Sequence, residues 1–275
     1  MKILFLFHDS WTQYPKADWL ASRIPLDGFL VIKKTRPWWG AYLWKRARRI
    51  GFGKVANEIV FRLYWLLMHS ARDQRMTSRL LEDLKRDIPP DYRRPPVHTV
   101  HDINSSDAEA LLKRLNPDVC VLMVNVILKK KIFSIPRLGM LVFHPGLTPE
   151  YRGPHSAFWA TLNHQFWGIG WSLLRVDAGI DTGNVLAQGS ATVDPLTQGH
   201  VYMQHKSHVD GLPRVVDTLK RLEAGEHPVV DARGRKSSNY THPGFSDYLR
   251  LRKFLKGLRA NAKGADARSV REVAE

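Results

Sequence analysis

The strongest constraint on the fold is a series of short, uninterrupted apolar runs separated by helix-length segments. Such runs occupy residues 3–7, 28–32, 119–124 and 138–143. A strand that is apolar at every position is buried on both faces, as in a parallel sheet covered by helices on each side. Further strands are expected at 170–176 and 185–187, and helices at 76–86, 108–115 and 156–162. The alternation predicts a three-layer α/β/α sandwich with a mostly parallel central sheet.

Length and cysteine content narrow the class of protein. The chain has 275 residues, of which 44% are hydrophobic and 25% charged, a balance typical of a folded domain. Its single cysteine, Cys120, allows neither an internal disulfide nor a cysteine-based zinc site. We therefore expect a reducing compartment and no metal. No stretch has the roughly 18 uncharged apolar residues of a membrane span, and the first apolar run is too short for a signal peptide. We expect a cytoplasmic protein.

The excess positive charge lies at the two ends of the chain. The formal net charge is +16. Residues 1–100 carry a net charge of +10, residues 101–211 are neutral, and residues 212–275 carry +6. Any attraction to anionic partners therefore belongs to the ends. We expect a main α/β domain at 1–215, with a basic Trp-rich helical insertion at 33–70 inside it. A basic C-terminal extension is expected at 216–275.

The insertion concentrates Trp and Arg between residues 36 and 69, including Trp38, Trp39, Trp44 and Trp65. The pattern predicts one or two amphipathic helices broken near Gly51-Phe52-Gly53. Three interpretations stay open. The helices pack on the core with a solvated basic face, or they lie on an anionic membrane surface, peripheral to the inner face, or they contact RNA. The sequence favours the first over the second, and the second over the third.

Two separated segments carry residues suited to catalysis. In the first, residues 143–154, His144 ends an expected strand and a Pro/Gly-rich loop follows. In the second, residues 176–188, Asp181 lies in a Gly-flanked turn. Ligands of open α/β sheets sit beyond the carboxyl ends of strands, and a neighbouring carboxylate favours the protonated form of an imidazole. We expect His144 and Asp181 to meet, although each motif alone is also a common turn.

The two motifs and the helix between them resemble the folate-dependent formyltransferase family. The matching strings are His144 to Gly153, then Phe158-Trp159-Ala160, then Val176 to Gly183, within roughly residues 115–190. The family includes glycinamide ribonucleotide transformylase, methionyl-tRNA formyltransferase and the sugar N-formyltransferases. The resemblance implies a Rossmann-like formyltransferase fold. It also implies transfer of a formyl group from N10-formyltetrahydrofolate, as co-substrate, to an amine.

The resemblance implies roles for particular residues. His144 and Asp181 fall on the family's catalytic pair, which stabilises an oxyanion and moves protons. The expected folate-binding residues are Val126, Ile127 and Leu128, where the family hydrogen-bonds the pteridine, and Asp177 and Gly179 on the opposite wall. The expected substrate and loop residues are Thr148, Tyr151, Arg152 and His155. Of these, Arg152 either meets an anionic group of the substrate or anchors the loop through a salt bridge.

One position departs from the family pattern. The family has an Asn two residues before the catalytic His, and here that position is Val142. Val cannot donate a hydrogen bond to the formyl oxygen, and the loss of one such donor typically costs about 10²–10³ in rate. Asn125 and His155 are the candidate replacements. The alternative for Asn125 is a polar residue at a strand end, and the alternative for His155 is a residue at a helix start.

The chemical class of the amine acceptor can be narrowed only by features that the sequence lacks. The loop after the first strand, His8-Asp9-Ser10-Trp11, has no Gly-rich phosphate cradle, which argues against a phosphoribosyl acceptor. The chain is also expected to end before the extra tRNA-binding barrel of the methionyl-tRNA enzyme. The favoured acceptor is an amino sugar linked to a nucleotide or a lipid. The alternatives are a catalytically inactive relative that binds folate or an amino sugar, and a tRNA-directed formyltransferase.

Overall fold

The computed structural model describes residues 1–33 and 39–272, without the side chains of residues 39, 41 and 261–272. Seven strands form one sheet in the order β3-β2-β1-β4-β5-β6-β7. The strands are β1 (Ile3–His8), β2 (Gly28–Ile32), β3 (Val97–Val100), β4 (Val119–Met123), β5 (Met140–His144), β6 (Gly170–Arg175) and β7 (Val185–Ser190). The first five strands are mutually parallel, and β6 and β7 run antiparallel to their neighbours. The predicted α/β fold with a mostly parallel sheet is confirmed.

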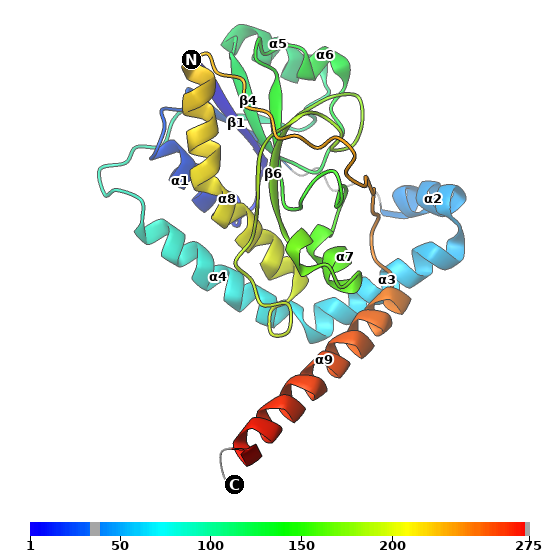
Figure 1. The fold of residues 1–275 in the computed structure, drawn as a ribbon. Coiled ribbons are helices and arrows are strands. Elements are labelled where there is room, and N and C mark those ends of the chain that lie inside the picture. Colours follow the sequence, from blue (N-terminus) through cyan, green and yellow to red (C-terminus); the bar gives the residue numbers. More distant parts are fainter. Residues whose placement is uncertain (34–38, 273–275) are drawn as a thin grey trace.

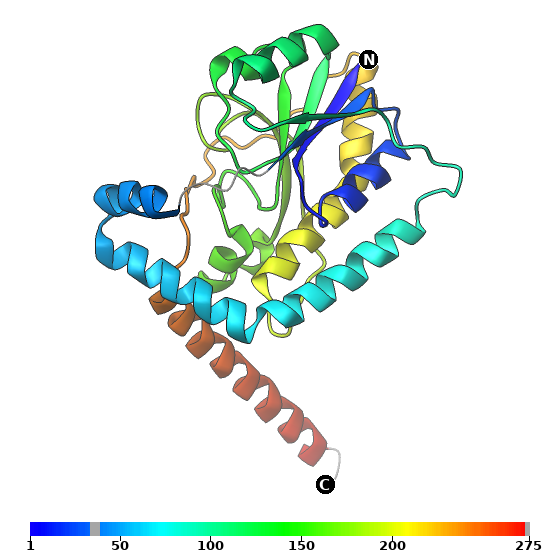
Figure 2. The ribbon, with the colours of Figure 1, turned by 180° about the vertical axis from the view of Figure 1, so that it is seen from behind.

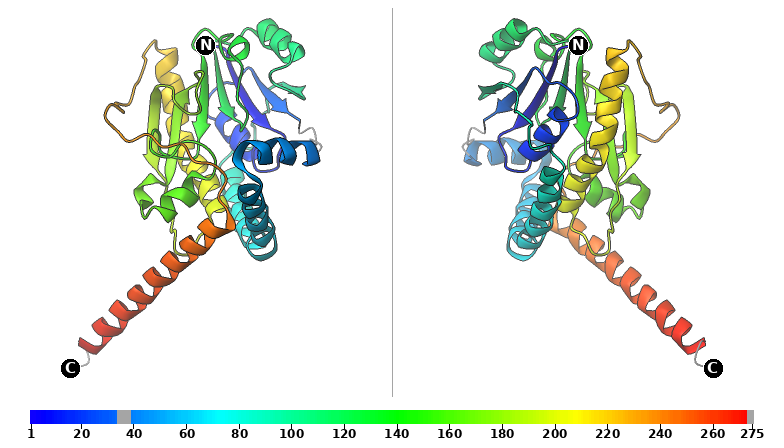
Figure 3. Two further views of the ribbon diagram at one scale, coloured as in Figure 1. Left: turned by 90° about the vertical axis from the view of Figure 1, so that its right-hand side faces the viewer. Right: turned by 90° about the vertical axis from the view of Figure 1, so that its left-hand side faces the viewer.

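Helices cover both faces of the sheet (Figure 1). They are α1 (Tyr14–Ala21), α2 (Trp39–Ile50), α3 (Phe52–Met68), α4 (Ser70–Arg86), α5 (Ser106–Leu115), α6 (Lys130–Phe133), α7 (Ser156–Leu162), α8 (His200–Glu223) and α9 (Phe245–Glu272), with a 3-10 turn at Phe166–Gly168. One core cluster joins the sheet to α1, α4 and α8, and a second joins it to α5 and α6. Side views show α5 and α8 on opposite sides of the sheet (Figure 3). These two cores make the three layers.

Several elements were missed from the sequence, among them three that lack the simple pattern of a buried strand or a one-sided helix. Strand β3 lies at the sheet edge and is half exposed, so it has no continuous apolar run. Helix α1 buries six of its eight residues, including Lys16, and is only weakly amphipathic. Helix α8 mixes three histidines with apolar residues and contains Pro213, which normally interrupts a helix.

Two expected boundaries fall within helices of the structure. Helix α4 begins at Ser70 rather than at Met76. Helix α8 runs across residues 215 and 216, where a domain boundary was expected, and Leu219 and Leu222 at its end pack in the main core. The division into a main domain, an insertion and an extension stays a prediction.

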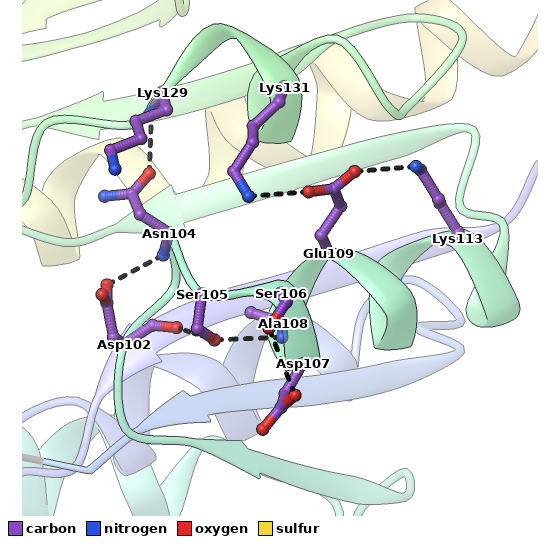
Figure 4. A network of polar contacts seen from close by, with 10 residues as sticks. All are labelled: Asp102, Asn104, Ser105, Ser106, Asp107, Ala108, Glu109, Lys113, Lys129 and Lys131. Atoms are coloured by element: carbon purple, nitrogen blue, oxygen red, sulfur yellow. Dashed lines mark hydrogen bonds and ion pairs between the residues drawn. The ribbon is translucent and has the colours of Figure 1, made fainter.

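The helix predicted near residue 108 begins as the sequence indicates. Ser105 is the N-cap of α5, and its side chain accepts a hydrogen bond from the Ala108 N–H at 3.2 Å. Asn104, just before it, reaches the loop after β4: its Nδ2 donates to the Ile127 carbonyl and its Oδ1 accepts from the Lys129 N–H. Figure 4 shows the Ser105 cap and the contact between Asn104 and Lys129. Asn104 therefore holds residues 127–129 in place at the carboxyl end of β4.

The Trp-rich insertion forms a pair of helices beside the sheet, seen most clearly in Figure 2. Helices α2 and α3 are separated at Gly51, whose φ of +94° suits a residue without a Cβ. The predicted break is thus confirmed. Trp38 and the rest of residues 34–38 lie outside the described residues. No helix within residues 1–33 or 39–272 is long and apolar enough to cross a membrane.

Candidate active site

His144 ends β5, at the carboxyl edge of the parallel strands. Its Nε2 lies 2.9 Å from the Tyr151 carbonyl oxygen. Because a carbonyl can only accept, Nε2 carries a proton. Its Nδ1 lies 3.5 Å from Asp181 Oδ2. The two residues that the sequence brought together on motif grounds are therefore neighbours. Nδ1 is the ring nitrogen that can gain or lose a proton, and a proton there would be stabilised by the Asp181 carboxylate.

Asp181 reaches His144 by an indirect route. Because β6 runs antiparallel to β5, the chain leaves β6 beside Met140, at the opposite end of β5 from His144, and the Val176 N–H donates to the Met140 carbonyl at 2.8 Å. The following loop folds back along the sheet. Asp181 takes a left-handed backbone conformation, with φ of +51°, and its Oδ2 accepts a hydrogen bond from the Gly153 N–H at 3.0 Å. This return loop was not predicted from the sequence.

The loop after His144 is held by buried polar contacts. Ser172 on β6 donates to the Gly146 carbonyl and accepts from the Thr148 N–H, at 2.8 and 3.0 Å. Tyr151 is fully buried, and its ring lies so close to Gly168 that a Cβ there would come within 2.3 Å of it. Burial raises the pKa of Tyr151 to about 12. Tyr151 therefore shapes the loop, and its carbonyl orients His144.

A cavity of about 610 Å³ adjoins Asp181. Thr148, Arg152 and Asp181 line it, together with residues 229–233 of the segment after α8. Arg152 Nη1 donates to the Ile180 carbonyl at 3.1 Å, while its buried Nε has no partner among the described residues. No ion pair of the described residues involves Arg152, so the salt-bridge alternative is not seen. The contribution of residues 229–233 was missed, because that segment carries no motif.

The expected folate-binding residues occupy two loops. Val126 and Leu128 pack on the core cluster next to α5, together with Val142 and Val176, while the Ile127 side chain is 68% exposed. The backbone N–H groups of residues 126–128 find no hydrogen-bond partner within the described chain. Polar backbone groups beside apolar side chains suit the edge of a heterocyclic ring. The structure does not test whether they bind one.

Asp177 and Gly179 hold the return loop in its turn. Asp177 Oδ1 accepts hydrogen bonds from the Gly179 N–H at 2.9 Å and from the Thr182 hydroxyl at 2.6 Å. A Cβ on Gly179 would lie 2.0 Å from the Thr182 hydroxyl oxygen, so only glycine fits there. Their contribution to the site is thus at least structural, and a role in folate binding stays a prediction.

The candidate replacements for the missing Asn lie in different surroundings. Val142 is two residues before His144 on one strand, so both side chains lie on the same face of the sheet. Asn125 is exposed at the end of β4. His155 is the N-cap residue of α7 but its side chain does not cap it; its Nε2 lies 3.2 Å from His242 Nδ1 instead. Burial lowers the pKa of His155 to about 4. An oxyanion donor at residue 125 or 155 stays a prediction.

A second row of basic side chains lies behind His144. His208 on α8 is buried, and its Nε2 donates to the Phe143 carbonyl at 2.9 Å. Lys16 is fully buried, and its Nζ lies 3.2 Å from His205 Nδ1. Burial lowers the pKa of Lys16 to about 7. These residues went unnoticed because α1 and α8 were not predicted. Within residues 1–33 and 39–272 no group of His, Cys, Asp and Glu side chains has the arrangement of a metal site.

The comparison with protein families agrees with this geometry. The family model described as formyl transferase matches residues 76–216, just over half of the chain. The chain belongs to the formyl transferase family. Both His144 and Asp181 lie within the matched residues, as do α5, β4, β5, β6 and β7. Helices α2 and α3 lie outside them.

Curated relatives of this formyl transferase cover part of its length. A methionyl-tRNA formyltransferase of Agathobacter rectalis is 28% identical over 160 residues, which is 54% of this chain and 50% of the relative. That of Paramagnetospirillum magneticum is 30% identical over 148 residues, covering 54% and 48% of the two chains. The chain spans about half the length of the curated relatives it matches.

Solved structures share the fold of this formyl transferase. A sugar N-formyltransferase from Shewanella has a TM-score of 0.51 at 13% identity, covering 91% of this chain and 87% of that one. A glycinamide ribonucleotide transformylase from Symbiobacterium toebii gives 0.51 at 14%, covering 88% and 95%. An N-formyltransferase from Helicobacter canadensis, in complex with folinic acid and dTDP-3-aminofucose, gives 0.50 at 13%, covering 87% and 71%. At these identities the likeness establishes the fold.

Proposed function

We propose that this protein transfers a formyl group from N10-formyltetrahydrofolate to the primary amine of an amino sugar. The observation that carries the proposal is the 3.5 Å approach of His144 Nδ1 to Asp181 Oδ2, beside a cavity that Asp181 and Arg152 line. Family membership supports the reaction class. The sugar N-formyltransferase neighbours, one of them bound to an amino sugar nucleotide, support the acceptor class.

In the proposed reaction the amine nitrogen attacks the formyl carbon, and the carbonyl electrons move onto oxygen. When they return, the bond between the formyl carbon and N10 breaks. The amine loses one proton and N10 gains one, so the transfer balances with no other reactant. His144 Nδ1 would accept the proton, because Nε2 already donates to the Tyr151 carbonyl. Asp181 would stabilise the imidazolium that forms, and the Gly153 N–H holds Asp181 in place.

Arg152 is suited to bind the carrier of the amino sugar. Its guanidinium lines the cavity beside Asp181, and its Nε has no partner among the described residues. A phosphate would pair with it through a charge-assisted hydrogen bond. Nucleotide-linked and lipid-linked sugars both carry such a phosphate. The cavity therefore suits a phosphate-bearing carrier, whether that carrier is a nucleotide or a lipid.

The test is a formyl-transfer assay on the full chain. N10-formyltetrahydrofolate is supplied with dTDP-linked amino sugars, lipid-phosphate-linked amino sugars or methionyl-tRNA, and release of tetrahydrofolate is followed. Turnover with an amino sugar that is lost in Arg152→Met supports the proposal. Turnover with methionyl-tRNA alone would replace the acceptor class, and no turnover with any acceptor would contradict the proposed activity.

A second candidate, a binding protein that has lost transfer, is favoured by one observation. Val142 shares a face of the sheet with His144 and offers no donor where the family has Asn. Under this alternative, folate binds without turnover, and Val142→Asn restores a measurable rate. If the unchanged protein turns over and Val142→Asn adds little, a different donor stabilises the oxyanion and the second candidate is wrong.

A further inference from the structure

Helix α3 presents an unusual apolar surface to solvent. Its outward side carries Phe52, Val60, Leu63, Leu66 and Leu67, spaced so that they share one helical face. Leu67 is 83% exposed and Leu63 55%. Trp44 of α2 continues this surface through an edge contact with Phe52, with ring centroids 5.5 Å apart. We call these six side chains the α3 stripe. A contiguous exposed apolar surface of this kind marks an interaction site.

The charge around the α3 stripe restricts the kind of partner. Residues 39–79 carry nine basic and two acidic side chains, a net charge of +7. Of the two acids, Glu58 is paired with Arg46 and Asp73 is buried. The surroundings of the stripe are therefore strongly cationic. A second copy of this chain would bring two such surfaces together, and repulsion would oppose that contact. The partner is expected to be anionic.

The side chains of the α3 stripe distinguish between anionic partners. Single-stranded nucleic acid binds through aromatic side chains on which bases stack, but four of the six stripe residues are aliphatic. Aliphatic side chains flanked by Lys, Arg and Trp are instead typical of helices that lie in a membrane interface. An anionic lipid surface therefore matches both the apolar and the charged parts.

A cavity of about 530 Å³ opens beneath the same helices. Its lining includes the apolar side chains of Leu43, Val55, Ile59 and Leu66 and the charged side chains of Arg46, Glu58 and Arg62. Its volume lies in the range of about 300–1,000 Å³ that is usual for ligand sites, and apolar walls with a few polar groups are typical of them. Leu63 and Leu66 belong both to this cavity and to the α3 stripe. The apolar surface therefore continues from the outside of α3 into the cavity.

The cavity also adjoins the catalytic loop. His155 lines it, and Gly153, two residues earlier, holds the Asp181 carboxylate. Two residues span at most about 7 Å. One short loop therefore forms the cavity wall on one side and supports the His144–Asp181 pair on the other.

We propose that α2 and α3 dock this protein on an anionic lipid bilayer, and that the cavity beneath them takes an alkyl chain of a lipid from that bilayer. Together with the proposed function, and resting on it, this makes a lipid-phosphate-linked amino sugar the acceptor class. Docking and chain binding themselves do not depend on catalysis, so they are tested without turnover.

Docking is tested by co-sedimentation of the full chain with vesicles. Vesicles of phosphatidylcholine with 30% phosphatidylglycerol are compared with phosphatidylcholine alone. The expected result is binding to the anionic vesicles that weakens with salt, and at least a tenfold loss in the Val60→Asp, Leu67→Asp double variant, whose two residues lie in the α3 stripe but do not line the cavity. Leu249→Asp, which changes an exposed Leu on α9, is the control and keeps wild-type binding. Absence of binding at low salt overturns the proposal, as does dimerisation through the stripe without vesicle binding.

Chain binding is tested with two neighbouring residues of α3. Leu66 lines the cavity, whereas Leu67 does not. Calorimetry with dodecyl phosphate below its micelle concentration is expected to show binding by the wild type and by Leu67→Asp, and at least a tenfold loss in Leu66→Asp. Inorganic phosphate alone, the head-group probe, is expected to bind at least tenfold more weakly. Equal binding of the two probes, or equal losses in both variants, would show that no alkyl chain enters the cavity.

Discussion

Residues 76–216 and the helix pair at 39–68 use apolar side chains in opposite ways. In the first region the strands bury almost every apolar residue, and the polar groups left at the sheet edge meet as His144 and Asp181. In the second, the helices leave Leu63, Leu67 and other large side chains exposed above a cavity. The family match covers the first region and omits the second. The proposed reaction and the proposed docking therefore rest on different regions and can be tested separately.

The largest expected effect comes from removing His144 or Asp181, the proposed acid–base pair, which belongs to the first region alone. His144→Ala and Asp181→Asn are each expected to lower kcat for formyl transfer by about 10²–10⁴, the usual contribution of a general acid–base group. Asn tolerates the left-handed conformation of residue 181 and can still accept from the Gly153 N–H. Stopped-flow or steady-state assays of tetrahydrofolate release provide the measurement. Unchanged vesicle binding in both variants is the matched control, and a rate within threefold of wild type would remove the pair from the mechanism.

The second prediction concerns acid pH and the buried histidines of the first region. Burial lowers the pKa of His155 to about 4 and that of His200 to about 3, and it also holds the pKa of His205 and His208 well below 6.5. Between pH 6.5 and about 4 the unfolded chain therefore binds more protons than the folded one, so stability falls as the pH falls. His155 alone accounts for roughly 3 kcal/mol between pH 7 and pH 4.

Urea unfolding at pH 7, 5.5 and 4.5 measures this effect. In His155→Gln the loss of unfolding free energy on acidification should shrink, and in His227→Gln, an exposed histidine, it should not. A slope that His155→Gln leaves unchanged would mean that His155 binds protons equally in the folded and unfolded chains, contrary to the lowered pKa.

The third prediction separates the helix pair from the sheet. Arg46 on α2 and Glu58 on α3 form an ion pair at 2.8 Å, with side chains only 12% and 16% exposed. Removing one partner leaves a largely buried charge, so Glu58→Gln should destabilise α2 by about 2 kcal/mol, seen as faster hydrogen exchange at 39–50. Exchange in β1 and β4 should not change. Lys113→Met, which breaks an exposed pair with Glu109, is the control because such pairs contribute little. Equal effects in both regions would show that they unfold as one unit.

The smallest expected effect concerns the loop after β4. Asn104→Ala removes the hydrogen bonds to the Ile127 carbonyl and the Lys129 N–H, worth about 1 kcal/mol each. If residues 126–128 bind the pteridine, KM for N10-formyltetrahydrofolate should rise about fivefold while kcat stays constant. Ser106→Ala, on the same turn, should leave KM unchanged. A change in kcat alone would place this loop outside the folate site.

The parts of the fold that could be predicted are those whose structure is set by a single local feature of the sequence, such as a continuous apolar run or a capping residue. Strands β1, β2 and β4 are buried on both faces, and their sequences are simply apolar. The start of α5 is set locally by the Ser105 cap. In contrast, β3 depends on pairing with β2 at the sheet edge, and α8 on packing around its histidines and Pro213. Such tertiary effects leave no local pattern to read.

The candidate site was predictable only in part. The meeting of His144 and Asp181 was expected from their places in two loops of an open α/β sheet, and the family resemblance added weight, since neither turn motif alone indicates a partner. The direction of β6, the cavity wall at residues 229–233 and the buried Lys16 depend on long-range packing. The cavity beneath α3 also depends on tertiary packing. From the sequence of that segment, helices packed on the core were favoured, and a membrane surface was the second interpretation.

The antiparallel direction of β6 sets the distance that the loop between β6 and Asp181 has to span. Val176 is hydrogen-bonded beside Met140, and His144 stands about 13 Å further along β5, four residues at about 3.3 Å each. Five residue steps from Val176 to Asp181 reach at most about 17 Å when fully extended. Deleting one residue between Val176 and Asp181 would force this segment into a nearly extended conformation and remove the turn at Asp177. The number of residues between Val176 and Asp181 is therefore tied to the length of β5.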